Sequence, residues 1–160
     1  MDFTIRKANK NDMPRVLELI QELATFEKEP NAVIVTVEQL QKDGFTGHPD
    51  FTCFVAETTN QIEGIALVFE RYSTWKGKVI HLEDLIVNQK MRSNGIGTAL
   101  LDKVIKYGAQ LGVKRISWEV LDWNLPAINF YNQKGANVME DWKVVHLNEE
   151  GINNYISKLK

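Results

Sequence analysis

The first strong pattern in the chain is an amphipathic stripe between residues 13 and 24. Its apolar residues recur every three or four positions, which is the spacing of one helix face; they are Met13, Val16, Leu17, Ile20, Leu23 and Ala24. Asn11 or Asp12 can cap this helix. The helix should end before Pro30, because a residue that precedes proline avoids helical backbone angles. A second, short helix is predicted over residues 36–42.

Strand patterns fill the middle of the chain. Residues 3–5 alternate between apolar and polar, and residues 51–57 and 62–72 are rich in β-forming side chains. A turn at residues 59–61 separates the latter two segments, so we expect them to pair antiparallel. Residues 78–87 are almost continuously apolar, which favours a central strand with both faces covered.

Helix and strand signals alternate in the second half. A stripe from residue 95 to 111 predicts a long helix, and residues 115–121 predict the next strand. A short helix capped by Asn124 should follow, then a last strand at 142–147 and a terminal helix over 149–160. Before that terminal helix the order is β-α-α-β-β-β-α-β-α-β. This order describes an α/β fold with a central mixed sheet flanked by helices.

Composition narrows the class of protein. The chain has 160 residues, 44% of them hydrophobic and 25% charged, with no linker or repeat, so we expect one soluble domain over 1–160. The net charge of −2 and the lack of a Lys/Arg tract predict no nucleic-acid partner. Without a signal-peptide stretch or an apolar run near ~18 residues, we expect a cytoplasmic protein with no membrane partner. Cys53 is alone and the three histidines are scattered, so neither a disulfide nor a metal is expected.

A glycine turn, Gly95-Ile96-Gly97, follows the apolar strand and opens the long helix. Glycines let the backbone approach a ligand closely, and the first N–H groups of a helix lack intrahelical partners, so the turn predicts an anion site. The Walker loop is excluded because no Gly-Lys-Ser/Thr tripeptide occurs. Leu100 at the third glycine position disfavours a dinucleotide fingerprint, although Glu119 lies near the ribose-binding spacing. By itself, the turn is equally consistent with a connection that merely needs glycine.

The residues around the turn carry a resemblance. Arg92 precedes Gly95 by three positions, and Asn124 and Tyr131 lie one strand–helix unit later. Further matching segments are Glu22-Leu23-Ala24, Asp43-Gly44-Phe45, His48-Pro49, Trp75-Lys76-Gly77-Lys78, Leu82-Glu83-Asp84, Trp123-Asn124, Asn129-Phe130-Tyr131 and Gly135-Ala136. Together they resemble the GNAT superfamily of N-acetyltransferases, most of all its diamine branch, the spermidine/spermine and thialysine enzymes. The resemblance implies the GNAT fold.

The same resemblance implies acetyl-CoA as co-substrate. The implied contacts come from the end of the feeding strand, from the glycine loop (residues 92–98) and from the short helix. They are Leu85, Ile86, Val87, Arg92, Ser93, Asn94, Gly95, Ile96, Gly97, Thr98, Asn124 and Ala127. For Asn124, a helix-capping role is an equally good interpretation, and both roles can hold together.

The transfer itself requires a neutral amine. Deprotonating a lysine-like ammonium, whose pKa is about 10.4, costs roughly 4.6 kcal/mol at pH 7. Glu83 and Asp84 are adjacent acids in an apolar strand, where an unpaired carboxylate is costly. Consecutive strand residues face opposite sides, so only one should point at the substrate unless a bulge intervenes. The alternative is a carboxylate paired with a basic residue such as Arg6.

The resemblance gives these residues roles. It implies Glu83 as a base that acts through water and Tyr131 as the general acid that protonates the leaving thiolate. A thiol pKa of about 8.5 and a phenol pKa of about 10 are close enough for that transfer. An ordinary core tyrosine is the alternative for Tyr131.

The acceptor side is also implied by the resemblance. Its residues are Phe26, Glu27, Ser73, Thr74, Trp75, Glu83, Asp84, Asp122 and Trp142. Aromatic faces and carboxylates suit a small cationic amine. Ser73-Thr74 stands where polyamine-acetylating members carry aspartate and proline, so a thialysine-type substrate is favoured over spermidine or spermine.

The last expectations concern the oligomeric state and two rival functions. The resembling enzymes are homodimers, so a homodimer is expected. A non-catalytic acyl-CoA-binding or polyamine-binding module on the same fold is one rival function, and a protein-directed acetyltransferase is another.

Overall fold

The sheet of this protein has five strands in sequence order, β1-β2-β3-β4-β5. The structure, a computed structural model, describes residues 2–59 and 61–159; Asn60 of the predicted turn and Lys160 of the predicted terminal helix lie outside them. The strands are β1 (Thr4–Lys7), β2 (Thr52–Glu57), β3 (Ile62–Ser73), β4 (Gly77–Val87) and β5 (Ile116–Ser117). The first four pair antiparallel, and β4 pairs parallel with β5. The predicted mixed sheet is confirmed. β4 lies between β3 and β5, although β5 pairs with it only at Ile80 and His81.

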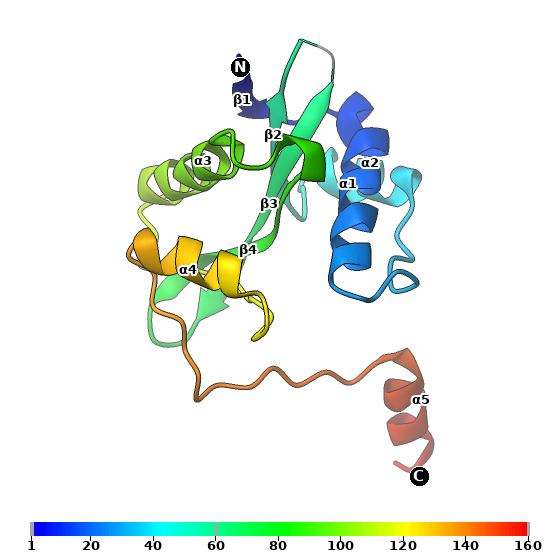
Figure 1. Cartoon of the computed structure of the whole chain (residues 1–160). Coiled ribbons are helices and arrows are strands. Elements are labelled where there is room, and N and C mark those ends of the chain that lie inside the picture. The colour runs from blue at the N-terminus through cyan, green and yellow to red at the C-terminus, as the bar shows by residue number, and fades with distance from the viewer. Residues whose placement is uncertain (1, 60, 160) are drawn as a thin grey trace. The chain divides into compact units, whose positions relative to one another are not determined.

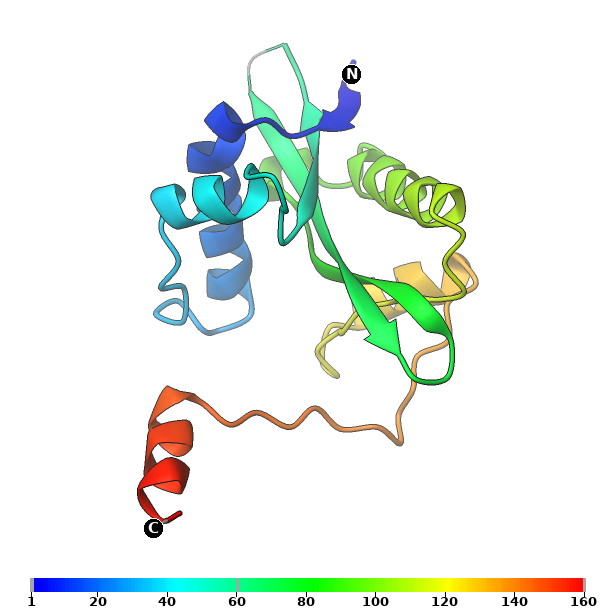
Figure 2. The same ribbon diagram turned by 180° about the vertical axis from the view of Figure 1, so that it is seen from behind.

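The chain divides into two compact units between Glu119 and Val120, and each unit is described by itself. In the first unit, α1 (Met13–Phe26) and α2 (Val37–Gly44) cover one face of the sheet and α3 (Ile96–Gln110) covers the other (Figures 1 and 2). Two short 3₁₀ turns, η1 (Lys10–Asp12) and η2 (Gln89–Met91), precede α1 and α3. Across residues 2–59 and 61–159, no helix combines the length and apolar character that a membrane crossing requires.

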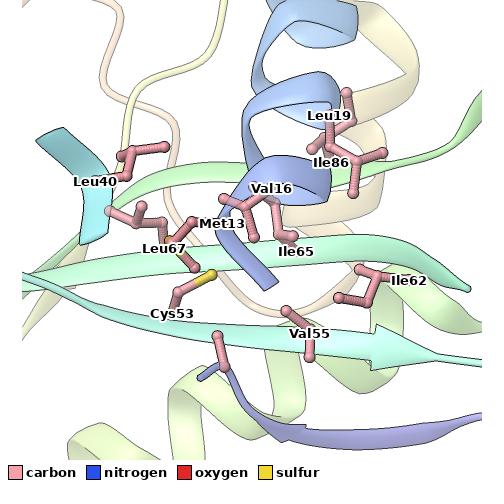
Figure 3. Close-up of a cluster of buried hydrophobic side chains, with 11 residues drawn as sticks. Met13, Val16, Leu19, Leu40, Cys53, Val55, Ile62, Ile65, Leu67 and Ile86 are labelled. Carbon is pink, nitrogen blue, oxygen red and sulfur yellow. The ribbon is translucent and has the colours of Figure 1, made fainter. Parts of the chain in front are cut away.

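The first helix is positioned by its cap and its apolar stripe. The Asn9 side chain caps η1 directly before α1, one turn earlier than the predicted Asn11 or Asp12. Met13, Val16 and Leu19 are fully buried and meet side chains of β2, β3 and β4 in the cluster of Figure 3. Cys53 lies in the same cluster, and burial raises the pKa of its thiol to about 12. It is therefore a small buried apolar residue and not a nucleophile.

The packing of α3 on the opposite face of the sheet depends on Gly64. Gly64 of β3 lies under α3, where an added Cβ would come within 2.9 Å of the Ile86 carbonyl oxygen and 3.2 Å of Ile96 Cγ2. A side chain at this position would push the helix away from the sheet. Gly64 therefore determines how closely the start of α3 approaches the end of β4. The glycine loop joins these two elements.

The second unit contains α4 (Leu125–Gln133) and α5 (Glu149–Ser157), both predicted from the sequence. The predicted strand over 142–147 is wrong: within the described part of the chain these residues form no strand. Its apolar alternation is present, but the second unit offers no strand for it to pair with, and a lone strand leaves its N–H and C=O groups unpaired. The predicted strand over 115–121 is likewise reduced to β5.

Candidate functional site

Two carboxylates meet at a bulge in β4. Leu82 pairs with Val68 and Asp84 pairs with Leu67, so Glu83 is the extra residue between them. A bulge breaks the strict alternation of faces. Asp84 lies opposite Leu67, on the α1 face. His81 lies on the same face, because its partner Phe69 is two residues from Leu67. Glu83 also reaches this face, since its Oε2 lies 3.6 Å from Nε2 of His81. The bulge therefore allows both acids to point toward one site.

The surroundings of the two acids differ. The Glu83 side chain is 55% exposed, whereas Asp84 is mostly covered. Burial raises the pKa of Asp84 to about 6, and the negative charges of Glu83 and Glu27 add to this effect. Glu27, the residue that ends α1, has its own pKa raised by desolvation. The three acids form a cluster, named the acidic cluster below, and repulsion within it favours a cation.

The alternative in which a carboxylate of the cluster pairs with Arg6 is not observed. Arg6 is held by Asp12 at 2.7 Å and by Glu57 at 2.7 Å. The neighbour of Glu83 is instead His81, a buried ring that packs on Phe69 with ring centroids 5.1 Å apart. Glu83 is thus free of a permanent cation partner among the described residues.

An amide in place of the buried acid should stabilise the fold at neutral pH. The pKa of Asp84 is higher in the folded chain than in the unfolded one, so the unfolded chain loses this proton first as pH rises. Below about pH 4 the acid is neutral in both states and Asp84→Asn should change little. The gain should grow up to about pH 6 and reach about 1–3 kcal/mol above it. Urea unfolding at pH 4.5, 6 and 8 measures this; a gain that shrinks with rising pH contradicts it.

Beyond the bulge, β4 has one free edge. Its last residues pair with β3, from Leu85↔Ala66 to Val87↔Gly64. On the other side β4 pairs with β5 only at Ile80 and His81, so among the described residues no strand accompanies 82–87 there. Backbone N–H and C=O groups on such an edge can bind an extended amide-bearing chain. The implied contacts at Leu85, Ile86 and Val87 lie on this stretch.

Two side chains of the glycine loop donate hydrogen bonds to backbone carbonyl oxygens at and before its start. Arg92 Nε donates to the Val87 carbonyl oxygen at 3.2 Å, and Asn94 Nδ2 donates to the carbonyl oxygens of Met91 and Arg92 at 3.1 Å each. Ser93 has a φ of 64° and Gly95 a φ of 82°. Left-handed backbone at a non-glycine residue is strained and is found often at functional sites. The side chains of Arg92 and Asn94 therefore shape the loop.

The loop ends at an uncapped helix start. Gly95 is the N-cap residue of α3 and supplies no side-chain acceptor, and the first helical bond runs from the Ala99 N–H to the Gly95 carbonyl. The N–H groups of Ile96, Gly97 and Thr98 precede that bond. They are donors suited to phosphate oxygens at the positive end of the helix dipole. The geometry of the turn fits a diphosphate-bearing ligand such as coenzyme A.

Arg92 also links the loop to the acceptor-side residues. Its guanidinium carbon lies 5.2 Å from the centre of the Phe26 ring, at the end of α1. Phe26 immediately precedes Glu27 of the acidic cluster. The structure thus brings together predicted residues of both kinds, acetyl-CoA-binding and acceptor-binding, in the first unit.

The β3–β4 hairpin carries the remaining acceptor-side residues of this unit. Ser73 and Lys76 close the turn by a backbone bond of 3.3 Å, and Ser73 Oγ accepts from the Trp75 N–H at 3.2 Å. Thr74 and Trp75 are exposed, Trp75 at 79%. The described contacts of Ser73 are internal to the turn.

The second unit holds the other predicted residues. Asn124 caps α4, and its Oδ1 accepts from the Ala127 N–H at 3.3 Å, so the capping interpretation is confirmed and the Ala127 N–H already has an acceptor. Tyr131 is buried on α4 and packs on Phe130, with ring centroids 5.4 Å apart. Asp122 and Trp142 are exposed.

Sequence reasoning missed Glu63 and Asn88, two residues that bind each other where β4 ends. Glu63 is buried in β3 and accepts from Asn88 Nδ2 at 2.8 Å. The available signal was an acid inside an apolar strand, the same signal that identified Glu83.

Comparison with known proteins identifies the family of this chain. The acetyltransferase (GNAT) family matches residues 13–136. The chain is 37% identical over 140 residues to thialysine N-epsilon-acetyltransferase of Mus musculus, covering 82% of each chain. It is 34% identical over 158 residues to spermidine/spermine N(1)-acetyltransferase-like protein 1 of Homo sapiens, covering 92% of this chain and 23% of that protein. Its fold is similar to that of an aminoglycoside N-acetyltransferase solved with CoA, with a TM-score of 0.70, 18% identity, and 91% and 94% of the two chains covered.

Proposed function

The chain belongs to the acetyltransferase (GNAT) family and is an N-acetyltransferase, and we propose that it acetylates a primary amine of a small lysine-like or diamine substrate with acetyl-CoA. The observation that carries this proposal is the acidic cluster: Glu83 and Asp84 lie on β4, directly before its free edge, and Glu27 joins them from the end of α1. A cation site thus adjoins a site for an extended acyl donor.

The acyl donor is proposed to bind along β4 and the glycine loop. The free edge at 85–87 offers backbone hydrogen bonds to the pantetheine amides, apart from the Val87 carbonyl, which already accepts from Arg92 Nε. The first N–H groups of α3 offer donors to the diphosphate. Arg92 adds a positive charge. Asn124 is proposed to contact the pantetheine arm while it caps α4.

The amine is proposed to bind as a cation and to lose its proton before attack. Glu83 accepts that proton through water, since its carboxylate is exposed and solvent reaches it. Asp84, with a pKa near 6, holds the cation and shares the negative charge of the cluster. The neutral nitrogen then attacks the thioester carbonyl directly, forming the C–N bond as the C–S bond breaks. The nitrogen releases its surplus proton to solvent water as it becomes the amide.

The leaving thiolate needs a proton, and Tyr131 is proposed to supply it. Its phenol and the thiol of coenzyme A have ordinary pKa values within about two units of each other. The electron pair of the C–S bond stays on sulfur, and the phenol O–H proton neutralises it. Solvent restores the proton to the tyrosine.

The acceptor preference is proposed to depend on the hairpin turn at Ser73 and Thr74. An aspartate at 73 can make the same turn contacts through its side chain, and proline suits position i+1 of a turn. The double variant S73D/T74P should therefore keep the fold while adding one carboxylate. We expect the ratio of kcat/KM for spermidine to that for thialysine to rise about tenfold.

The control for this exchange is S73N/T74P, which keeps the turn chemistry without the charge. A ratio that rises equally in both variants would assign the effect to turn shape. A ratio unchanged in S73D/T74P would remove the hairpin from acceptor selection. The homodimer and the cytoplasmic location, both expected from the sequence, stay predictions.

A further inference from the structure

Glu63 occupies an unusual place for an acid. It is the second residue of β3, is 6% exposed, and precedes a run of buried apolar residues at 64–68. Burying a carboxylate is costly unless hydrogen-bond donors surround it. Two side-chain amides do so here: Gln61 Nε2 donates to Glu63 Oε1 at 3.0 Å, and Asn88 Nδ2 donates to Glu63 Oε2 at 2.8 Å.

Asn88 is the residue at which β4 ends and the chain turns toward the glycine loop. Its backbone N–H donates to the Glu63 carbonyl oxygen at 2.8 Å, so backbone and side chain both bind Glu63. Its Oδ1 faces the other way and accepts from the Lys90 N–H at 3.2 Å, which caps η2. One side chain therefore joins a buried acid to the turn that leads into Arg92.

We propose that Glu63 and Asn88 are positioning residues that fix the glycine loop in its ligand-binding conformation. This inference rests on the proposed function, in which that loop binds the diphosphate of acetyl-CoA. The loop contains strained backbone at Ser93 and exposed residues at 92–95, and the hydrogen bonds of its Arg92 and Asn94 side chains run only to carbonyl oxygens of residues 87–92. Its position therefore depends on how that preceding stretch is held. If Asn88 fixes the chain before the loop, the loop loses less conformational entropy when the ligand binds, and the ligand binds more tightly.

The pair can be tested by exchanging its donor and acceptor. In Asn88→Asp, a second carboxylate faces Glu63 and the two repel. In E63Q/N88D, the new amide of residue 63 donates to the new carboxylate of residue 88, and its oxygen still accepts from Gln61. The second carboxylate oxygen of residue 88 retains the cap on η2. The exchange thus restores all three hydrogen bonds and reverses the polarity only of the bond between residues 63 and 88.

We expect Asn88→Asp to raise both the KM for acetyl-CoA and the Kd of CoA about tenfold, which equals about 1.4 kcal/mol. The kcat and the KM for the amine should stay within about twofold of wild type. E63Q/N88D should recover the Kd to within about threefold. Isothermal titration with CoA gives the Kd independently of turnover, and initial rates give the split between KM and kcat.

Two further variants separate positioning from general destabilisation. Asn88→Ser keeps a good capping side chain but loses the bond to Glu63, so it should weaken CoA binding even if Asn88→Asp fails to fold. Cys53→Ala, at the other end of the sheet's core, should lower the melting temperature and leave the Kd unchanged.

The outcomes distinguish this inference from the function on which it rests. A wild-type protein that neither binds CoA nor uses acetyl-CoA would overturn the proposed function. A wild-type protein that does both, with the same Kd in Asn88→Asp and Asn88→Ser, would overturn the positioning role alone. A loss that the exchange E63Q/N88D does not repair would also overturn it.

Discussion

Replacing Tyr131 with phenylalanine is expected to lower kcat about a hundredfold while both KM values stay within about twofold. General acids contribute about 10²–10⁴ to the rate of the step they serve. The substitution removes one hydroxyl from a buried ring and leaves the packing against Phe130 in place. A loss confined to kcat means that the hydroxyl acts in the transition state and not in ground-state binding.

Tyr107→Phe is the matched control for this experiment. Tyr107 lies on α3 and packs edge-on against Phe54, with ring centroids 5.4 Å apart, and it has no proposed role in the chemistry. Its kcat should stay near that of wild type. Equal losses in Tyr107→Phe and Tyr131→Phe, or no loss in the latter, would remove Tyr131 from the mechanism. A binding module without turnover would show no rate to lose in either variant.

The second large effect is expected from the two acids of β4. Glu83→Gln should lower kcat/KM for the amine about a hundredfold at pH 7, because no base then accepts the proton of the bound ammonium. Asp84→Asn should remove a break in the pH profile. In the wild type, kcat/KM should fall more steeply below about pH 6, where Asp84 takes up a proton and the cation loses a negative partner.

This break adds to the steady rise with pH that follows from ionisation of the amine itself, so the two variants give different profiles. Glu83→Gln should lower the whole curve, and Asp84→Asn should keep the steady rise without the steeper limb. Glu70→Gln, at an exposed acid of β3 that lies 3.7 Å from Lys78 Nζ, is the control and should match wild type. A steep limb that survives in Asp84→Asn would contradict the assignment.

Much of the fold was predictable because its elements are set by local patterns. The stripe that begins at Met13, the apolar run of β4 and the glycine before α3 each specify one element by itself. The strand over 142–147 was predicted wrongly for the opposite reason. A strand exists only with a partner, and the alternation of its side chains does not say whether one is present in its part of the chain.

The sequence allowed us to predict which residues belong to the candidate site, but not how most of them are arranged in space. The bulge at Glu83 depends on the register between β3 and β4, and a single strand does not reveal a register. The bond between Glu63 and Asn88 joins residues 25 positions apart, so no local pattern indicates it. The capping of α4 by Asn124, in contrast, follows from the residue type and position alone.

The central claim is acetyl transfer from acetyl-CoA to a small amine. Its most direct test is the initial rate of CoA release by the wild-type protein with an acceptor panel of thialysine, lysine, short diamines, spermidine, spermine and a lysine-containing peptide. We expect acetylated product, with kcat/KM highest for thialysine or another small lysine-like amine or short diamine. A highest value for spermidine, spermine or the peptide, or CoA binding without turnover of any acceptor, would contradict this claim.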